Sequence, residues 1–259
     1  MQNGGMFDLT GKVALITGSS RGIGKAIAEA LADAGAKVVI SSRKADACKA
    51  VADQLVERGR HAIAVPCNVS SKEELQRLVD ATLAEWGGVD VLVCNAATNP
   101  VFGPLSQVLD SAFDKVMGTN VRSNFWLCNM VIPQMAERRD GAVILIASIA
   151  GIKGNTTIGT YGISKAAEMQ LARNLALEWG PHNIRVNSIA PGVIRTDFAR
   201  ALWEDGGKRS RLEAATPLRR IGEPRDIAGL AVLLASPAGS FITGQSIVID
   251  GGRTIAEAI

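Results

Sequence analysis

Short apolar runs alternate with longer helical patterns along most of this chain. The apolar runs are rich in valine, isoleucine and leucine and nearly uninterrupted, which is typical of strands buried on both faces of a sheet. We predict strands at residues 12–17, 37–41, 61–66, 90–95, 142–148, 184–190 and 246–250. Alanine- and leucine-rich segments between them predict helices at about 22–34, 44–58, 71–86, 107–138, 161–179 and 224–235.

The repeated alternation of strand and helix predicts right-handed βαβ units. The expected fold is one α/β domain over residues 1–259, a Rossmann-type doubly wound sheet of seven parallel strands with helices on both faces. Residues 191–223 break this rhythm with a long irregular stretch. Long connections in compact α/β folds are usually binding loops, so we expect a substrate lid here, with a plain surface insertion as the alternative.

Composition narrows the classes of function. The chain carries 28 basic and 25 acidic residues, a balance that favours neither nucleic acid nor a membrane surface as a partner. The cysteines lack a CxxC pair, which indicates a reducing compartment and no metal site; they are Cys48, Cys67, Cys94 and Cys128. The N-terminal segment lacks a signal pattern, and no apolar run is long enough to span a bilayer. We therefore expect a cytoplasmic protein.

A glycine-rich turn follows the first predicted strand and leads directly into the first predicted helix. It reads Thr17-Gly-Ser-Ser-Arg-Gly-Ile-Gly24. Glycines in this place let the backbone approach a pyrophosphate, and the helix N-terminus offers free N–H groups. We expect a dinucleotide here, with an ordinary turn as the alternative. The expected contacts are Gly18, Ser20, Arg21, Gly22, Ile23 and Gly24.

The end of the second strand carries the residues expected to select the dinucleotide. An acidic residue there usually holds the ribose of NAD, but this chain has Ser42 followed by Arg43. A hydroxyl and a guanidinium can bind a 2′-phosphate, and Arg21 adds positive charge nearby. We therefore predict NADP(H) rather than NAD(H), with a solvated helix start as the alternative role of Arg43.

Two further strand ends are expected to line the cofactor. Asn68 and Val69 follow the third strand and can contact the adenine, or can form an ordinary turn. The fourth strand ends in Asn95, Ala96 and Ala97, where small residues let the backbone approach the ribose.

Tyr161 is the only tyrosine in the sequence, and it stands four residues before Lys165. Residues i and i+4 share one face of a helix, so the phenol and the ammonium should be neighbours. An ammonium favours the phenolate, so we expect a lowered pKa of Tyr161 that suits general acid–base catalysis. Ser148, at the end of the fifth strand, can hold a substrate oxygen. A tyrosine on a helix is more often a packed ring, but Ser148 and the dinucleotide turn together favour hydride transfer at a carbonyl carbon.

In order along the chain, these motifs resemble the short-chain dehydrogenase/reductase family over nearly the whole length. The matching residues are Thr17–Gly24, Asn95–Ala97, Asn120, Ser148, Tyr161 with Lys165, Asn187, Pro191 with Gly192, Thr196 and Asp250–Gly252. The resemblance implies that the catalytic residues are Asn120, Ser148, Tyr161 and Lys165. It also implies that Lys165 binds the nicotinamide ribose and that Asn120 holds a water in a proton relay.

The resemblance implies further contacts. Pro191, Gly192, Ile194 and Thr196 would bind the cofactor, the last two at the nicotinamide carboxamide. The helices near 107–138 and 161–179 would pair in a homodimer or homotetramer. The chain departs from the usual family pattern at Ala97, where glycine is common, and at Asn68, where aspartate is usual. We expect cofactor binding to survive both departures, with a weaker adenine contact at Asn68.

The expected substrate follows from the fourth strand end and the lid. Residues 95–103, 219–224, Phe198, Leu202 and Trp203 resemble NADPH-dependent carbonyl and retinal reductases of the dehydrogenase/reductase member 4 type. This favours reduction of an apolar or aromatic ketone or aldehyde. The expected pocket residues are Thr98, Ile149, Asn155, Phe198, Leu202 and Trp203, although Phe198 and Trp203 can alternatively fasten the lid to the core.

Two alternative functions remain. One is a 3-oxoacyl-acyl-carrier-protein reductase, but the carrier-docking arginines of that subgroup align with Trp126 and Leu177, which cannot attract an acidic carrier protein. The other is a non-catalytic NADPH sensor, which would not need an intact set of Asn120, Ser148 and the Tyr161–Lys165 pair.

Overall fold

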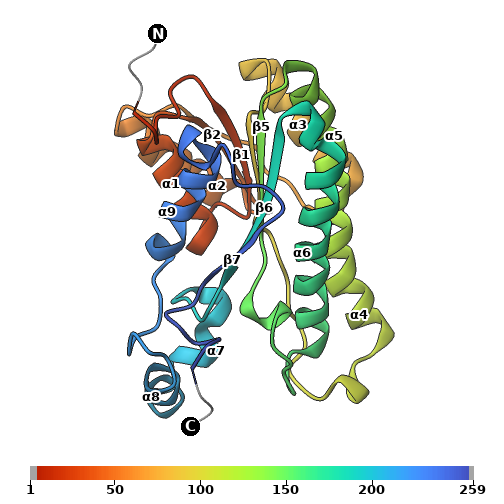
Figure 1. The fold of residues 1–259 in the computed structure, drawn as a ribbon, viewed down its shortest axis with the longest axis vertical. Coiled ribbons are helices and arrows are strands. Elements are labelled where there is room, and N and C mark those ends of the chain that lie inside the picture. The colour runs from red at the N-terminus through yellow and green to blue at the C-terminus, as the bar shows by residue number, and fades with distance from the viewer. Residues whose placement is uncertain (1–4, 257–259) are drawn as a thin grey trace.

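The computed structural model describes residues 5–256 (Figure 1). The described residues do not include 1–4 and 257–259. These belong to the predicted domain, and the first four also belong to the N-terminal segment considered above. All strands are parallel and form one seven-stranded sheet in the order β3-β2-β1-β4-β5-β6-β7, which confirms the predicted fold class. The strands are β1 (Val13–Thr17), β2 (Lys37–Ser41), β3 (Ala62–Ala64), β4 (Val91–Cys94), β5 (Gly141–Ile146), β6 (Ile184–Pro191) and β7 (Ser246–Ile249).

Helices cover both faces of the sheet (Figure 1). One layer consists of α1 (Gly22–Asp33), α2 (Ala45–Glu57) and α9 (Pro224–Ala235), and the other of α3 (Lys72–Trp86), α5 (Ser123–Arg138) and α6 (Gly159–Trp179). Consecutive side chains of a strand point to opposite faces, so Ala14 and Ile16 of β1 join the first core and Leu15 joins the second. The uninterrupted apolar runs are therefore explained by two cores, one on each face of the sheet, to which all strands except the edge strand β7 contribute side chains on both faces.

Local capping explains where two of these helices begin. The Ser71 hydroxyl accepts a hydrogen bond from the N–H of Glu74 at 3.1 Å and so caps α3. At α9, Glu223 and Asp226 form a reciprocal capping box, and Pro224 occupies the first helical turn, where its missing N–H costs nothing. Both starts agree with the predicted helices at 71–86 and 224–235.

The segment predicted as one helix at 107–138 is divided in the structure. It contains α4 (Asp110–Met117), a π-helical turn η2 (Gly118–Arg122) and α5. Turns of this kind occur mostly within α-helices and frequently at functional sites. Here the π-helical turn places Asn120 in a fully buried position.

The long connection after β6 contains two short helices, α7 (Arg200–Trp203) and α8 (Gly206–Ala214). Figure 1 shows both at the end of the molecule where the C-terminus lies. The two ends of this connection are joined, because the N–H of Arg195 donates to the carbonyl of Gly222 at 2.8 Å and the N–H of Gly222 donates to the carbonyl of Val193 at 3.0 Å. The two ends of the connection are thus held together, and the N–H of Leu218 also donates to the carbonyl of Gly251, just after β7, at 3.1 Å.

Over residues 5–256, the structure contains no helix with the length and apolar character required to cross a membrane. The four cysteines are free thiols and are buried. In the single chain, Phe113 of α4, Phe125 of α5 and Leu177 of α6 are exposed to solvent. The predicted pairing of these helices in a homo-oligomer stays a prediction.

Candidate active site

The glycine turn joins β1 to α1 where the strand order reverses between β1 and β4. Gly18 has a φ of +67°, and a Cβ atom there would lie 2.8 Å from Nδ2 of Asn95. A Cβ atom on Gly24 would collide with the same nitrogen and with the carbonyl oxygen of Gly18. Only glycine fits at these two positions, so the turn is compact and its backbone can be approached closely by a ligand.

Asn95 fastens the end of β4 to this turn. Its Nδ2 donates to the carbonyls of Thr17 at 3.0 Å and Gly18 at 3.1 Å. The Thr17 hydroxyl oxygen in turn accepts from the N–H groups of Asn95 at 3.0 Å and Ala96 at 3.1 Å. The structure therefore brings Asn95 and Ala96 to Gly18, and gives Asn95 a bracing role that the sequence reasoning did not predict.

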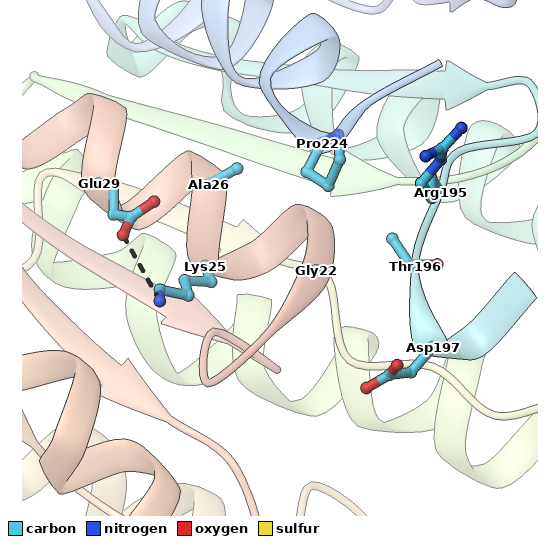
Figure 2. Close-up of a pocket in the computed structure, with 8 residues that line it drawn as sticks. All are labelled: Gly22, Lys25, Ala26, Glu29, Arg195, Thr196, Asp197 and Pro224. Carbon is cyan, nitrogen blue, oxygen red and sulfur yellow. Dashed lines mark ion pairs between the residues drawn. The ribbon is translucent and has the colours of Figure 1, made fainter. Parts of the chain in front are cut away.

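The start of α1 suits a bound anion. Arg21 is the N-cap residue, and its side chain does not cap the helix, so the first N–H groups and the positive end of the helix dipole are available to a ligand. A hollow of about 360 Å³ lies beside this turn, lined by Gly22 and Lys25 of α1 and by Thr196 and Asp197 (Figure 2). The compact glycines and the uncapped helix end fit the pyrophosphate of a dinucleotide.

Thr196, predicted to lie near the nicotinamide, faces Gly22. A Cβ atom added to Gly22 would lie 3.2 Å from the methyl carbon of Thr196. Pro191 ends β6 and is paired with Ile249, and an added Cβ atom on Gly192 would lie 2.8 Å from the Cα atom of Asp250. Ile194 is buried. The predicted residues after β6 thus face the same strand edge as the glycine turn.

The side chains predicted to select the dinucleotide form no hydrogen bond with one another in the described part of the chain, and each has different surroundings. Ser42 Oγ lies 3.1 Å from the Cys48 thiol, and Arg43 is exposed at the end of β2 without an ion pair among residues 5–256. Arg21 reaches instead to Asp197 at 3.4 Å. The Asn68 side-chain oxygen accepts from the N–H of Ser70 at 3.2 Å, as in the alternative reading of an ordinary turn.

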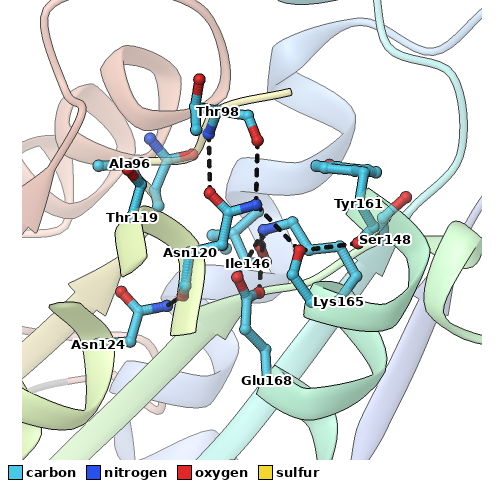
Figure 3. Close-up of polar contacts among 12 residues, drawn as sticks. Ala96, Thr98, Thr119, Asn120, Asn124, Ile146, Ser148, Tyr161, Lys165 and Glu168 are labelled. Carbon is cyan, nitrogen blue, oxygen red and sulfur yellow. Dashed lines mark hydrogen bonds and ion pairs between the residues drawn. The ribbon is translucent and has the colours of Figure 1, made fainter. Parts of the chain in front are cut away.

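Tyr161 and Lys165 lie on neighbouring turns of α6, and Ser148 follows β5 beside them (Figure 3). Nζ of Lys165 is 5.5 Å from the centre of the Tyr161 ring. A hydrogen bond from Ser148 helps to lower the pKa of the Tyr161 phenol, although other influences outweigh it. The predicted catalytic serine, tyrosine and lysine are therefore brought together at the carboxyl edge of the sheet.

The predicted lowering of the Tyr161 pKa is wrong in its net direction. Burial is the largest influence and raises the pKa above its usual value. Lys165 lowers it, as expected, but a second charged residue, Glu168, raises it. Sequence reasoning recognised the ammonium and could not know how far the phenol is shielded from water. Tyr161 is consequently a protonated phenol at neutral pH.

Glu168 is a residue of this site that the sequence reasoning missed. Nζ of Lys165 donates to its two carboxylate oxygens at 2.8 and 2.9 Å and to the carbonyl of Ile146 at 2.7 Å. The side chains of Lys165 and Glu168 are 2% and 0% exposed. Burial raises the pKa of Glu168 to about 7 although Lys165 opposes the rise. Burial also lowers the pKa of Lys165, but Glu168 and Tyr161 outweigh it, so that pKa lies above its usual value.

Asn120 braces the other side of the site (Figure 3). Its Oδ1 accepts from the N–H of Thr98 at 2.8 Å, and its Nδ2 donates to the carbonyl of Thr98 at 3.1 Å and to the Ser164 hydroxyl at 3.0 Å. Its own carbonyl accepts from Nδ2 of Asn124 at 2.7 Å. Asn120 therefore ties the loop after β4 to α6, and its part in a proton relay stays a prediction.

The predicted substrate residues have different surroundings. The Phe198 ring lies 5.9 Å from the Tyr161 ring, centre to centre, which places it beside the predicted catalytic phenol. Nε1 of Trp203 donates to the carbonyl of Thr196 at 3.0 Å, a contact within the segment 191–223, so both predicted roles of Trp203 stay predictions. Asn155 is engaged in its own turn, since its Oδ1 accepts from the N–H groups of Thr157 and Ile158. Ile149 and Leu202 are partly buried.

Comparison with known proteins gives matches over almost the whole chain. A family profile described as enoyl-(acyl carrier protein) reductase matches residues 18–254. The dehydrogenase/reductase SDR family member 4 of Bos taurus is 41% identical over 244 residues, which cover 94% of this chain and 88% of the relative.

Two solved structures show the same architecture. A 7α-hydroxysteroid dehydrogenase complexed with NADH and 7-oxo glycochenodeoxycholic acid has a TM-score of 0.93 and 39% identity, covering 97% of this chain and 98% of that one. A gluconate 5-dehydrogenase from Burkholderia cenocepacia in complex with NADP and tartrate has a TM-score of 0.93 and 32% identity, covering 97% of this chain and 98% of that one. One neighbour holds NADH and the other NADP, so similarity does not choose the dinucleotide. The extent and identity of these matches, together with the gathered serine, tyrosine and lysine, show that the chain belongs to the short-chain dehydrogenase/reductase family of nicotinamide-dependent oxidoreductases that act on alcohols and carbonyls.

Proposed function

We propose that this protein is an NADP(H)-dependent reductase of apolar or aromatic ketones and aldehydes. The observation that carries the proposal is the position of Tyr161, a protonated phenol beside Ser148 and Lys165 that faces the Phe198 ring 5.9 Å away. The bound nicotinamide supplies a hydride to the carbonyl carbon. Tyr161 gives its proton to the carbonyl oxygen, which Ser148 orients, so that an alcohol results.

The charge state of Tyr161 supports this direction of reaction. Burial keeps the phenol protonated at neutral pH, and a protonated group can donate to a carbonyl oxygen that gains electron density. Oxidation of an alcohol would instead require the phenolate, which burial disfavours here. The proposed direction is therefore reduction.

The surroundings of the phenol support an apolar substrate. Phe198 belongs to the loop after β6 and is 54% exposed, so it offers apolar surface beside the reacting position. We propose that residues 191–223 act as a lid over this position. The steroid dehydrogenase named above is crystallised with a largely apolar ketone, whereas the gluconate dehydrogenase is named for a polar sugar acid. The Phe198 ring favours the first kind of substrate.

The first test is consumption of NADPH, with a parallel NADH series, across aromatic ketones, α-dicarbonyls, retinal-like aldehydes, sugars and acetoacetyl thioesters. We expect turnover with NADPH on the apolar carbonyls. Activity confined to the thioester would replace the proposal with an acyl-thioester reductase. Tight NADPH binding without turnover of any compound would favour the non-catalytic sensor, and equal rates with NADH would contradict the proposed cofactor.

Arg43 provides the test of cofactor choice. We expect Arg43→Ala to raise the KM for NADPH by about 10-fold or more, because a charge-assisted contact with the 2′-phosphate is lost. The KM for NADH should stay the same, since NADH has no such phosphate. Steady-state kinetics with both cofactors measures this. Arg58→Ala, at the opposite end of α2, is the matched control and should change neither KM. An equal rise in both constants for Arg43→Ala would show that Arg43 does not read the phosphate.

A further inference from the structure

Glu168 is a charged side chain inside the core layer between α6 and the sheet. It follows Lys165 by three residues, on the face of α6 that also carries the buried Ser164 and Ala172. Its side chain is 0% exposed. Among residues 5–256, its carboxylate makes hydrogen bonds to Lys165 alone (Figure 3). A buried carboxylate is costly to place in a core, so a specific role is expected.

The structure satisfies every donor of the Lys165 ammonium, so the predicted contact of Lys165 with the nicotinamide ribose would have to replace one of these hydrogen bonds. An ammonium has three N–H donors, and the structure supplies three acceptors within 2.9 Å, namely both oxygens of Glu168 and the carbonyl of Ile146. Ile146 belongs to β5, a central strand of the sheet. The charge beside Tyr161 is therefore held between a helix and a strand, neither of which can shift without disturbing the core.

Within residues 5–256, the Glu168 carboxylate is also the only negatively charged group that hydrogen-bonds to the Lys165 ammonium. Desolvation disfavours a buried ammonium strongly, and a neutral carbonyl alone cannot offset it. Lys165 without Glu168 would lose its proton far more readily than an ordinary lysine. The pKa directions agree, since burial lowers the pKa of Lys165 and the charge of Glu168 raises it again.

We propose that Glu168 is a positioning residue that keeps Lys165 charged and fixed beside the catalytic phenol. The inference rests on the proposed function, because it assigns to Lys165 a part in the reaction of Tyr161. Glu168 itself touches neither the substrate nor the reacting atoms; it acts through the lysine.

The other titratable groups near Lys165 do not offer a negative charge at neutral pH that could replace that of Glu168. Cys94 of β4 faces the pair, and Cys128 of α5 lies next to it. The Cys128 thiol and burial raise the pKa of Cys94 well above its usual value, so Cys94 is a neutral thiol. Tyr161, on the preceding turn of α6, is protonated at neutral pH and so carries no negative charge there. Tyr161 and Cys94 add to the rise in the Lys165 pKa, but Glu168 is the largest contributor to it.

Glu168→Gln keeps the shape of the side chain and removes its charge. Lys165 should then lose its proton within the alkaline range, and kcat for reduction should fall about 10-fold or more between pH 7 and pH 9. The wild-type rate should not fall over this range, since the pKa values of Tyr161 and Lys165 both lie above their usual values and Glu168 only gains charge as pH rises through its pKa of about 7. A flat profile for the variant would overturn the proposal.

A second readout does not depend on catalysis. Tyr161 is the only tyrosine, so the tyrosinate absorbance of the whole protein during a pH titration reports this phenol alone. If Lys165 is neutral in Glu168→Gln, the titration midpoint of Tyr161 in this variant should equal the midpoint in the double variant Lys165→Met/Glu168→Gln. A midpoint lower by about one pH unit or more in the single variant would show that the lysine stays charged without Glu168, and would overturn the proposal even if no substrate had been found.

Two further variants separate this role from a merely structural one. Glu168→Asp retains the charge and should keep the alkaline profile close to that of the wild type. Glu178→Gln makes the same chemical change at an exposed position of α6 and should alter neither kinetics nor titration. Thermal unfolding at pH 7 and pH 9 checks that each variant is folded during the assays. A loss of stability in Glu168→Gln with an unchanged rate profile would leave Glu168 a packing residue only and contradict the proposal.

Discussion

Tyr161→Phe is expected to lower kcat for carbonyl reduction by about 100- to 10,000-fold, the range usual for loss of a general acid. The phenylalanine ring can keep the packing against Phe198 and lacks only the hydroxyl that donates the proton. Because this hydroxyl acts in the transition state, cofactor binding should be largely unchanged. Steady-state kinetics and NADPH fluorescence titration measure the two quantities separately.

Thr160→Val is the matched control for this prediction. Thr160 precedes Tyr161 in α6, and its buried hydroxyl makes no hydrogen bond among the residues that the structure describes. Removing it takes away a neighbouring hydroxyl of no assigned function, and kcat should stay at the wild-type level. Near-normal turnover by Tyr161→Phe would rule out the phenol as proton donor, whatever the control shows.

Lys165→Met is expected to reduce the free energy of unfolding at pH 8 by about 3–5 kcal/mol, because it leaves the Glu168 carboxylate buried without its partner. Denaturant unfolding followed by circular dichroism measures this loss. The cost should depend on pH, since a proton on Glu168 removes the unpaired charge.

The direction of that dependence follows from the raised pKa. A carboxyl whose pKa is higher in the folded state binds more protons when folded, so its contribution to stability is lost as pH rises through that pKa. Glu168 has a pKa of about 7 in the wild type, and the loss of Lys165 should raise it further. The variant should therefore differ least from the wild type near pH 5, and the difference in the free energy of unfolding should grow as pH rises above 7.

The double variant Lys165→Met/Glu168→Gln separates charge from packing. Without either charge, most of the stability lost at pH 8 should return. An equal loss in the single and double variants, without pH dependence, would mean that the packed stem of Lys165 and not the orphaned carboxylate is responsible.

The strands could be predicted because an uninterrupted apolar run is visible in the order of the residues. Each predicted run matches an observed strand, with shifts of about one to two residues at the ends. The division of 107–138 could not be predicted in this way. A π-helical turn changes the hydrogen-bond register without changing which residue types are present, so Gly118–Arg122 looks like continuous helix in the sequence. The placement of Asn120 follows from that turn.

The gathering of Ser148, Tyr161 and Lys165 at one place could be predicted from their spacing and strand context, but the charge balance around them could not. The pKa of Tyr161 depends on burial, which a motif does not state. Glu168 did leave a signal, because it falls on the stripe of α6 that includes Lys165 and Ala172. A charged residue on an otherwise buried helical face is a sign of a paired core charge, and that reading would have found it.

The closed loop between β6 and α9 bears on how such a protein can acquire a new substrate. Its ends are pinned by the hydrogen bonds that join Arg195 and Gly222, so the distance that any replacement segment must span is already set. Lengthening a surface loop of this kind costs little closure entropy, and the sheet would not have to be redesigned. Exchanging residues 197–221 between relatives is therefore a route to altered selectivity that leaves Ser148, Tyr161 and Lys165 in place.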